Sequence, residues 1–191
     1  EEALELDRIN GNHLWAEAIA KEKTNCKIAF KFLGRDAPPP VGYKRITCHM
    51  VFDVKFDLTR KARYVAGGHL TDEPSTMSYA SVVSRDSVRI LFTIAALNNL
   101  DVKMCDIGNA YLNATTREKV YFTAGSEWSD QQGETVIIVR ALYGLKTSGA
   151  EWKRHFADTL EHTLQFKASR ADDNVWMKKC KKADGTEYYS Y

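Results

Sequence analysis

Apolar and polar residues recur along this chain with two different periods, and each period predicts one kind of element. A helical period runs through residues 12–24, where Leu14, Trp15, Ala18 and Ile19 fall on one side of the predicted helix. Charged residues occupy the rest of its surface. This pattern predicts an amphipathic helix that packs its apolar side against another element.

Beyond this helix the period changes to two, which predicts a β-hairpin. Three prolines at residues 38–40 exclude a helix and mark an extended linker. From Ile46 to Phe56, apolar side chains occupy every second position, as in a half-buried strand. Residues 57–60 make a turn, and residues 62–66 return as the second strand before two glycines end it.

The rest of the chain mixes both periods. A polar loop at residues 71–81 precedes a helix that begins at Ser84 or Asp86 and continues to Asn98. The inner face of that helix is predicted to hold Val88, Leu91, Ile94 and Ala95. Further elements are the strands 102–107, 119–123, 135–140, 175–179 and 187–191 and the helix 148–164. This order predicts an α+β fold in which helices pack on an antiparallel sheet.

Length and composition narrow the class of protein. The 191 residues can bury a sizeable core, as one compact unit or two closely associated subdomains. Apolar residues at 44% and charged residues at 27% are typical of a soluble globular protein. The apolar runs are too short to span a membrane, and no secretory leader opens the chain, so we expect no membrane partner. Because the chain opens with Glu1 and not with methionine, we expect it to be an internal piece of a longer protein.

Cysteines and charge refine this picture. The four cysteines have neither CxxC spacing nor histidines at zinc-ligand distances, which predicts unpaired thiols in a reduced intracellular setting. The net charge of +2 is weak evidence for a nucleic-acid partner. Residues 41–70 are more informative, because six basic residues face only two acidic ones there. Such a patch suits phosphate contacts, although basic stretches are more often ordinary solvated surface.

The segment Met104–Leu112 carries the first candidate chemistry. Asp106 lies at the end of a predicted strand, and Tyr111 follows five positions later. A carboxylate at a strand end can bind Mg²⁺ beside substrate phosphates, because Mg²⁺ needs few protein carboxylates. Asp101 is not its partner, since five residues along one strand place two side chains on opposite faces. Taken alone, the segment equally fits an aspartate that caps a turn and a tyrosine of the core.

A second segment, residues 141–152, contains the run Leu-Tyr-Gly-Leu-Lys at Leu142–Lys146 before a helix with Trp152. Together the two segments resemble motifs A and B of reverse transcriptases, most closely those of copia-type (Pseudoviridae) LTR retrotransposons. The resemblance covers nearly the whole chain from about Leu14 onward. Residues 61–67 resemble the hairpin of the family's fingers subdomain. The fold implied is the fingers and partial palm of a right-hand polymerase.

The resemblance implies a metal site and a nucleotide site. Asp106 would be a catalytic metal ligand, with the carbonyl of Ile107 as a further ligand. The complete enzyme would hold two Mg²⁺ ions, or Mn²⁺ in their place. Tyr111 would lie under the sugar of the nucleotide, where its ring collides with a 2′-hydroxyl. Tyr143 would flank the same sugar, and Gly144 would let the backbone touch the nascent base pair.

Basic residues complete the implied site. Arg63 would grip the nucleotide triphosphate, with Lys55 or Lys61 as a second cation. Arginine is the better candidate, because a guanidinium makes forked contacts with phosphate while an ammonium acts as a point charge. Lys146 would face the phosphates of template or primer. Without the resemblance, the three basic residues of the hairpin would be taken for solvated surface charges.

The chain departs from the family pattern at several positions. Thr147 and Gly149 stand where relatives have glutamine and proline, which weakens the template contacts expected at that turn. Gly108–Asn109 stands where many relatives have lysine and threonine. The adjacent pair Asp172–Asp173 lies in a polar run rather than in an apolar hairpin. We therefore interpret it as structural and not as the missing metal-binding pair.

These observations predict two regions and one parent function. Residues 1–40 form an N-terminal helix and linker, and residues 41–191 form a reverse transcriptase core of fingers and first part of the palm. The family's Tyr-x-Asp-Asp hairpin would follow Tyr191. The parent would be an RNA-directed DNA polymerase that adds deoxynucleotides to a primer 3′ end by two-metal phosphoryl transfer. This fragment alone is expected to be inactive.

The implied partners are an RNA or DNA template–primer duplex, deoxynucleoside triphosphates, and the remaining polyprotein with the rest of the palm, thumb and ribonuclease H. An intracellular location is expected, in a cytoplasmic virus-like particle or the nucleus. Two alternatives stay open. The chain can be a catalytically inactive nucleic-acid-binding remnant of such an element, or an α+β protein whose motif matches are accidental.

Overall fold

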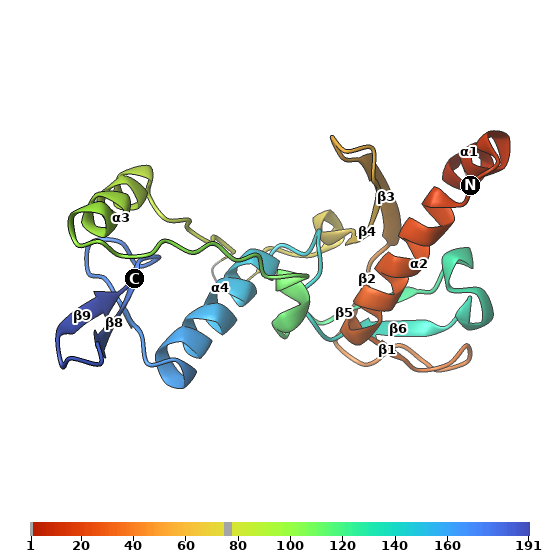
Figure 1. The fold of residues 1–191 in the computed structure, drawn as a ribbon. Helices are drawn as coiled ribbons and strands as arrows, with labels where there is room; N and C mark the ends of the chain where they lie inside the picture. Colours follow the sequence, from red (N-terminus) through yellow and green to blue (C-terminus); the bar gives the residue numbers. More distant parts are fainter. Residues whose placement is uncertain (1, 75–77) are drawn as a thin grey trace. The chain divides into compact units, whose positions relative to one another are not determined.

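The computed structural model describes residues 2–74 and 78–191 (Figure 1). The chain divides into two compact units. The first comprises Glu1–Ser78 and Asn109–Trp152, and the second comprises Tyr79–Gly108 and Lys153–Tyr191. Within the described ranges, no helix has the length and apolar character needed to cross a bilayer.

The four cysteines are free, as predicted, and burial raises the pKa of the Cys48 thiol to about 12.

The first unit combines N-terminal helices with two sheets. Its helices are α1 (Glu2–Asn10), α2 (Leu14–Cys26) and the 3-10 turns η1 (Lys27–Ala29), η2 (Gly68–Leu70), η3 (Ala110–Asn113) and η4 (Ser126–Gln131). Its strands are β1 (Phe30–Phe32), β2 (Lys44–Arg45), β3 (Cys48–Val54), β4 (Arg60–Ala66), β5 (Val120–Thr123) and β6 (Thr135–Ile138). One sheet has the order β1-β6-β5-β2, in which only the β2–β5 pair is parallel. The β3–β4 hairpin forms the other, antiparallel sheet, in a register that pairs Cys48 with Ala66 and Val54 with Arg60.

An aromatic cluster forms the core of this unit. The rings of Phe30, Phe122, Tyr64 and Trp128 meet with centroid separations of 5.3 to 5.9 Å, mostly edge to face. The Tyr64 side chain is 0% exposed, and its hydroxyl donates to Glu127 Oε1 at 2.6 Å and accepts from Trp128 Nε1 at 3.0 Å. Burial, followed by the hydrogen bond to Glu127, raises the pKa of Tyr64. The core therefore joins the hairpin to the four-stranded sheet.

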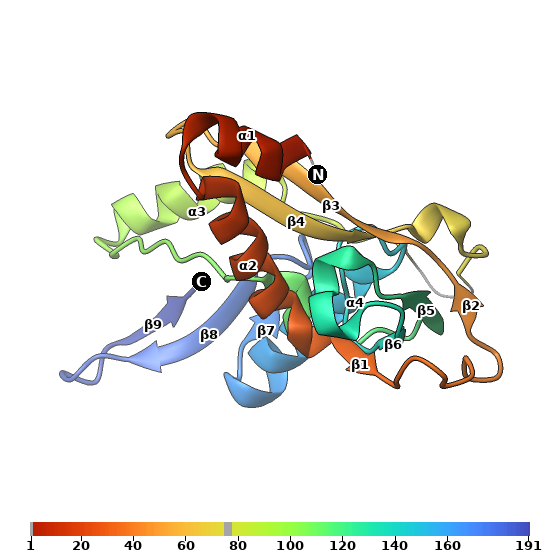
Figure 2. The same cartoon turned by 90° about the vertical axis from the view of Figure 1, so that its right-hand side faces the viewer.

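Helix α2 packs along the hairpin (Figure 2). The buried carboxylate of Asp7 accepts hydrogen bonds from the backbone amides of Trp15 and Ala16, which satisfies amide groups at the first turn of α2. Trp15 then meets Phe52 of β3 edge to face at 5.3 Å. Near the C-terminal end of α2, Glu22 Oε1 accepts a hydrogen bond from the amide of Tyr64 at 2.9 Å. Trp15 of the predicted apolar side thus packs on the hairpin, whereas Leu14, which was predicted on the same side, is exposed.

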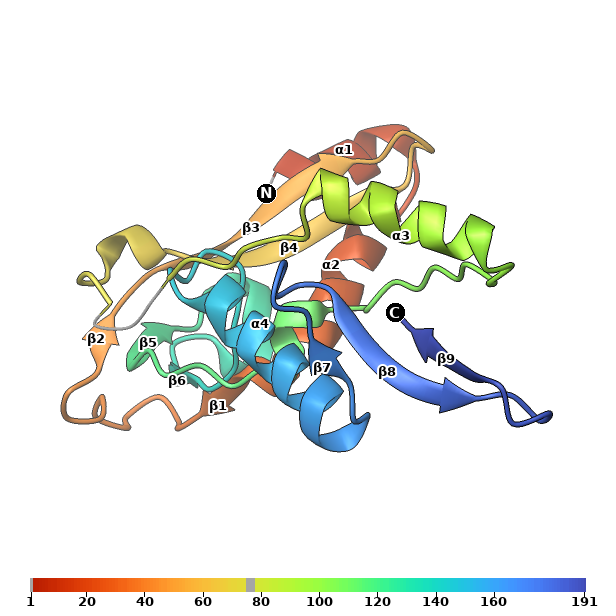
Figure 3. The same cartoon turned by 90° about the vertical axis from the view of Figure 1, so that its left-hand side faces the viewer.

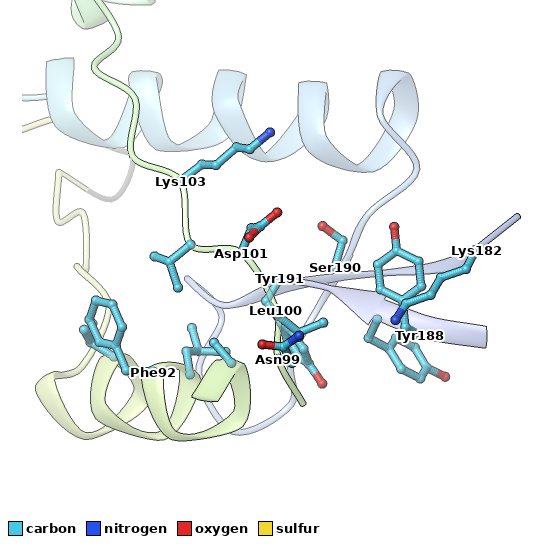
Figure 4. A pocket seen from close by; sticks show the side chains of 14 residues that line it. Phe92, Asn99, Leu100, Asp101, Lys103, Lys182, Tyr188, Ser190 and Tyr191 are labelled. Atoms are coloured by element: carbon cyan, nitrogen blue, oxygen red, sulfur yellow. The ribbon is translucent and has the colours of Figure 1, made fainter. Parts of the chain in front are cut away.

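The second unit combines a helix with a small antiparallel sheet (Figure 3). Its elements are α3 (Arg85–Leu97), the C-terminal part of α4 (Ser148–Asp158), the π-helical turn η5 (Thr159–Thr163), β7 (Lys167–Ala168), β8 (Trp176–Lys181) and β9 (Glu187–Ser190). The strand order is β7-β8-β9. A groove of about 710 Å³ lies between α3, residues 99–103 and β9 (Figure 4). Val88 and Leu91 line its apolar part, as predicted for the inner face of the helix.

Most predicted elements are present. The helices at 12–24, 84–98 and 148–164 and the strands of the hairpin are confirmed, and so are the strands near 119–123, 135–140, 175–179 and 187–191. The mixed α+β class is confirmed, although the β-structure consists of three small sheets and contains one parallel pair. Helix α1 and the short strands β1, β2 and β7 were not predicted. Part of the predicted loop at 71–81 lies outside the described residues.

The strand predicted at residues 102–107 is wrong. These residues form no strand among the described elements, and their side chains are exposed, Met104 at 98%. Apolar alternation predicts which side chains share a face, but a strand also needs a neighbour to hydrogen-bond with its backbone. No described strand pairs with this segment. Asp106 therefore follows a stretch without regular secondary structure and not a sheet strand.

Candidate functional site

The tyrosines of the two motifs lie against each other in the first unit. The ring centroids of Tyr111 and Tyr143 are 4.9 Å apart, and the rings are inclined by 52°. Tyr111 belongs to η3, which begins after the left-handed backbone of Asn109 at φ 52°. The η3 turn is tied to the residue that precedes the second segment, because Arg140 donates to the Leu112 carbonyl at 3.3 Å. Tyr143 is 47% exposed, so the pair presents an aromatic surface to solvent.

Gly144 follows this pair and requires a glycine for two reasons. Its φ of +92° lies in the region that side chains rarely adopt. A Cβ at this position would also lie 2.0 Å from the carbonyl oxygen of Ala66. A Cβ at Gly68 would likewise lie 2.0 Å from the carbonyl oxygen of Gly144. The turn of the second motif is thus packed, backbone against backbone, on the end of β4.

This packing explains why residue 144 is a glycine, and the sequence alone did not reveal this explanation. We expected Gly144 to allow a close approach to a base pair, whereas the space next to its Cα is filled by β4 of the same chain. The amide of Ala66 also donates to the carbonyl of Tyr143 at 2.7 Å, which fixes the residue that carries the exposed ring. The nucleotide-binding role of Gly144 stays a prediction. Gly68 was missed as a site residue, and only its place in the pair that ends the hairpin pointed to it.

Lys146 is engaged within the first unit. Its ammonium donates to the carbonyl oxygens of Thr71 at 2.9 Å and Asp72 at 3.4 Å, and lies 3.4 Å from Glu73 Oε1. These contacts hold the 71–73 segment against the second motif. A phosphate would have to compete with them, so the predicted contact to template or primer stays a prediction. In the described part of the chain Lys146 is a structural tie.

Thr147 forms hydrogen bonds with Glu118 of the same unit. Its amide and hydroxyl donate to Glu118 Oε1 at 2.9 and 2.7 Å. Ser148 then closes the turn, since its hydroxyl donates to the carbonyl of Leu142 at 2.6 Å and accepts from the amide of the same residue at 3.0 Å. The departure from the family's glutamine at Thr147 therefore leaves a well-bonded turn before α4.

The basic residues of the hairpin differ in how they are held. Arg63 lies 3.7 Å from the carboxylate of Asp53 on the neighbouring strand. Ala62 and Tyr64 are buried, whereas Lys61 and Arg63 alternate with them and are half-buried. By the pleat of a strand, Lys61 and Arg63 belong to the face turned away from α2. Lys55 is exposed at the end of the hairpin.

Asp106 belongs to the second unit and is exposed, as is Ile107. Among residues 2–74 and 78–191, no three histidine, cysteine, aspartate or glutamate side chains are grouped so that they could hold a metal ion. The described residues therefore do not form a metal site by themselves, and Asp106 supplies one carboxylate. Its predicted convergence with Tyr111 and Tyr143 stays a prediction.

The pair Asp172–Asp173 is structural, as the sequence indicated. Asp172 accepts from the amide of Ser84 at 2.9 Å, from the hydroxyl of Ser87 at 2.7 Å and from the amide of Asn174 at 3.0 Å. These hydrogen bonds, first of all that from the Ser84 amide, hold the pKa of Asp172 below its usual range. Asp173 pairs with Lys153 at 2.8 Å. The pair thus fastens the start of α3 and is already engaged by protein groups.

Comparison with known proteins agrees with the resemblance read from the motifs. Residues 37–184 match the family model described as reverse transcriptase (RNA-dependent DNA polymerase). The chain is 28% identical over 183 residues to a retrovirus-related Pol polyprotein from transposon RE2 of Arabidopsis thaliana, covering 85% of the chain and 12% of the relative. It is 27% identical over 149 residues to the Pol polyprotein of transposon TNT 1-94 of Nicotiana tabacum, covering 73% and 11%.

A third relative comes from a fungus. The truncated transposon Ty1-A Gag-Pol polyprotein of Saccharomyces cerevisiae is 32% identical over 112 residues, covering 57% of the chain and 9% of the relative. No solved structure matches the chain. The chain spans about an eighth or less of the length of these relatives. The family match covers most of the chain, and the chain therefore belongs to the reverse transcriptase family, as a copia-type member from a retrotransposon polyprotein.

Proposed function

We propose that the parent of this chain is an RNA-directed DNA polymerase, and that Tyr111 and Tyr143 form the surface that receives the sugar of an incoming deoxynucleotide. The observation that carries the proposal is the contact of the two rings at 4.9 Å, because they come from the two motifs on which the family resemblance rests. The parent would copy an RNA or DNA template from a primer 3′ end. Its substrates would be deoxynucleoside triphosphates.

Selection of the sugar follows from the bulk of the rings. The 2′-hydroxyl of a ribonucleotide would collide with the Tyr111 ring. Either the ribonucleotide or the ring would then have to move away. The ring cannot retreat freely, because Tyr143 lies on it and the Tyr143 backbone is bonded to β4. A rigid wall discriminates by steric exclusion more effectively than a mobile side chain, since closely packed groups give way only at a cost in free energy.

The triphosphate would be received by the hairpin. Arg63 is only half-buried and its partner Asp53 lies at 3.7 Å, so this ion pair can open toward a phosphate at little cost. The exposed Lys55 and the half-buried Lys61 add positive charge to the same hairpin. Phosphoryl transfer requires positioning and neutralisation of this charge.

We propose magnesium as a cofactor of the parent protein only, and not of the 191-residue chain by itself. Asp106 and the carbonyl of Ile107 are oxygen ligands of the kind that Mg²⁺ prefers, and a bound metal would neutralise charge on the reacting phosphates. A single exposed carboxylate holds Mg²⁺ weakly in water. The 191-residue chain alone is therefore expected to be inactive, and the rival function is that of a nucleic-acid-binding remnant. The lack of a three-ligand metal cluster among the described residues is compatible with both functions, because the further ligands of the parent are expected beyond Tyr191.

Primer extension tests the proposal. The 191-residue chain and a longer polyprotein segment that continues beyond Tyr191 would be compared on a primed RNA template with Mg²⁺ and deoxynucleotides. We expect extension by the longer protein and none by the shorter one. Asp106→Asn should abolish extension in the longer protein, whereas Asp101→Asn, a matched change in the same segment, should preserve it. Full activity of the Asp106→Asn protein would contradict the proposed centre.

A further inference from the structure

Gly68 lies directly against the turn that carries Tyr143. A Cβ at Gly68 would lie 2.0 Å from the carbonyl oxygen of Gly144 and 3.1 Å from the Cα of Leu145. Both obstacles are backbone atoms, so a change of side-chain rotamer cannot remove them. The φ of Gly68 is not positive, and its backbone would therefore accept an alanine. Contact with the turn, and not local conformation, is what requires a glycine at position 68.

Hydrogen bonds hold the segment around Gly68 on both sides of this contact. On the N-terminal side, the amide of Ala66 donates to the carbonyl of Tyr143 at 2.7 Å. On the C-terminal side, the carbonyl of Gly68 accepts from the amide of Thr71 at 3.1 Å and from the Thr71 hydroxyl at 2.7 Å. The carbonyl of Thr71 in turn accepts from Lys146 at 2.9 Å. The segment therefore cannot move away from the turn without breaking these hydrogen bonds.

The part of the turn that can yield is Tyr143 with Gly144. Leu142 and Leu145, on either side of them, are 1% and 6% exposed and are anchored in the core. Tyr143 is largely exposed, and Gly144 has the conformational freedom of a glycine. A group that pushed on the Gly144 carbonyl would therefore rotate the backbone at these two residues and leave the leucines in place. The Tyr143 ring would then change its inclination against Tyr111, which is 52° in this structure.

We propose that Gly68 is a positioning residue, which sets the ring of Tyr143 against Tyr111 and thereby contributes to the discrimination between deoxynucleotides and ribonucleotides. The inference rests on the proposed function, in which the two rings form the surface that receives the sugar. It adds a residue that belongs to neither motif and that acts only through Tyr143. Steric selection depends on the position of a wall, because a misplacement of about 1 Å in an active site can cost about a hundredfold in rate.

Gly67 provides a matched control. A Cβ at Gly67 would also meet neighbours, at 2.9 Å from the hydroxyl and 3.0 Å from the carbonyl oxygen of Thr47. Thr47 precedes β3 and does not belong to the turn of Tyr143. Gly67→Ala therefore strains the same pair of glycines without a push on the ring. An effect that Gly68→Ala has and Gly67→Ala lacks is due to the turn, and not to general strain at the end of β4.

The first measurement follows the two rings in the 191-residue chain. Each ring lies in the ring-current field of the other, so NMR resonances of the Tyr111 and Tyr143 ring protons report their relative position. We expect Gly68→Ala to shift both sets of resonances and Gly67→Ala to leave them near the parent values. Thr71→Val is a second variant, because it removes the hydroxyl bonded to the Gly68 carbonyl and adds no atom at the contact with the turn. It should shift the same resonances by less.

The second measurement is nucleotide selection in a longer polyprotein segment that contains this chain and extends primers. Gly68→Ala should raise the use of ribonucleotides relative to deoxynucleotides by about fivefold, and Thr71→Val by about twofold. Gly67→Ala should keep the parent's preference. Tyr143→Ala, which removes the ring itself, should raise the use of ribonucleotides at least as much as Gly68→Ala does.

Two results would overturn the inference. Ring resonances that Gly68→Ala does not shift, or that Gly67→Ala shifts equally, would show that the contact with Gly144 does not position the ring. Shifted resonances with an unchanged preference between nucleotides would show that this position does not govern selection. Tyr143→Ala separates this failure from failure of the proposed function. If its preference changes, only the role of Gly68 is lost, and if it does not, the tyrosine pair is not the sugar site either.

Discussion

The two units of the chain use their apolar residues differently. In the first unit, Leu142 and Tyr64 are almost completely buried, and the second motif is packed on β4 without room for a methyl group at Gly144. In the second unit every residue of α3 is described, yet none is buried, and the apolar side of the helix borders an open groove. The first unit thus obtains its cohesion from its own core. The second unit leaves apolar surface in water, where it contributes less to stability.

The sharpest test of this contrast compares two leucines. Leu142→Ala should destabilise the chain by about 3 kcal/mol, because it removes a buried side chain and leaves a cavity in a closely packed core. Leu91→Ala removes the same atoms from the half-exposed face of α3 and should cost about 1 kcal/mol. Urea unfolding followed by circular dichroism measures both. Equal losses would contradict the contrast between the two units.

A second test uses the glycine of the second motif. Gly144→Ala must change a backbone at φ +92° or push the Ala66 carbonyl away, and should cost about 2 to 3 kcal/mol. Gly108→Ala is the control, because a Cβ there would meet no atom within 4 Å and its φ is not positive. Thermal unfolding should show a clear shift for the first variant and almost none for the second. A neutral Gly144→Ala would mean that the close approach to β4 is not required.

The smallest expected effect concerns pH and the second unit. Hydrogen bonds hold the pKa of Asp172 below its unfolded value of about 3.9, so its contribution is fully present above that pH and declines as the pH falls toward the folded pKa. Asp172→Asn should therefore remove part of the acid sensitivity of α3 below about pH 4. Hydrogen exchange of the first amides of α3, followed from pH 6 downward, measures this. An unchanged pH dependence would show that Asp172 does not fasten the helix.

Local patterns predicted most elements, and long-range contacts account for the rest. The alternation in the hairpin and the period of α2 and α3 could be read directly, because each depends on neighbours in the sequence. The segment at 102–107 has the same alternation, but it finds no pairing strand among the described residues. Phe56 continued the alternation and was taken as part of a strand, whereas β3 ends at Val54 and the ring lies in the turn.

The candidate site likewise contains some features that the sequence predicted and others that depend on long-range contacts. The motifs indicated that Tyr111 and Tyr143 act together, and the contact of their rings agrees with that expectation. The requirement for glycine at position 144 could not be predicted from the motif. It arises from the close approach of the Ala66 carbonyl, and Ala66 is far away in the sequence. The same holds for Lys146, whose partners belong to the 71–73 segment. Motifs identify which residues matter, but not which of them are held by the rest of the chain.

Incorporation of ribonucleotides tests the central claim most directly. In a longer polyprotein segment that contains this chain, Tyr111→Ala should raise the use of ribonucleotides relative to deoxynucleotides by at least about tenfold, because the variant would lack the proposed wall against the 2′-hydroxyl. Tyr111→Phe keeps the ring and should retain the parent's preference. A Tyr111→Ala enzyme that still extends primers with undiminished discrimination would contradict the assignment of the tyrosine pair to the sugar of the nucleotide.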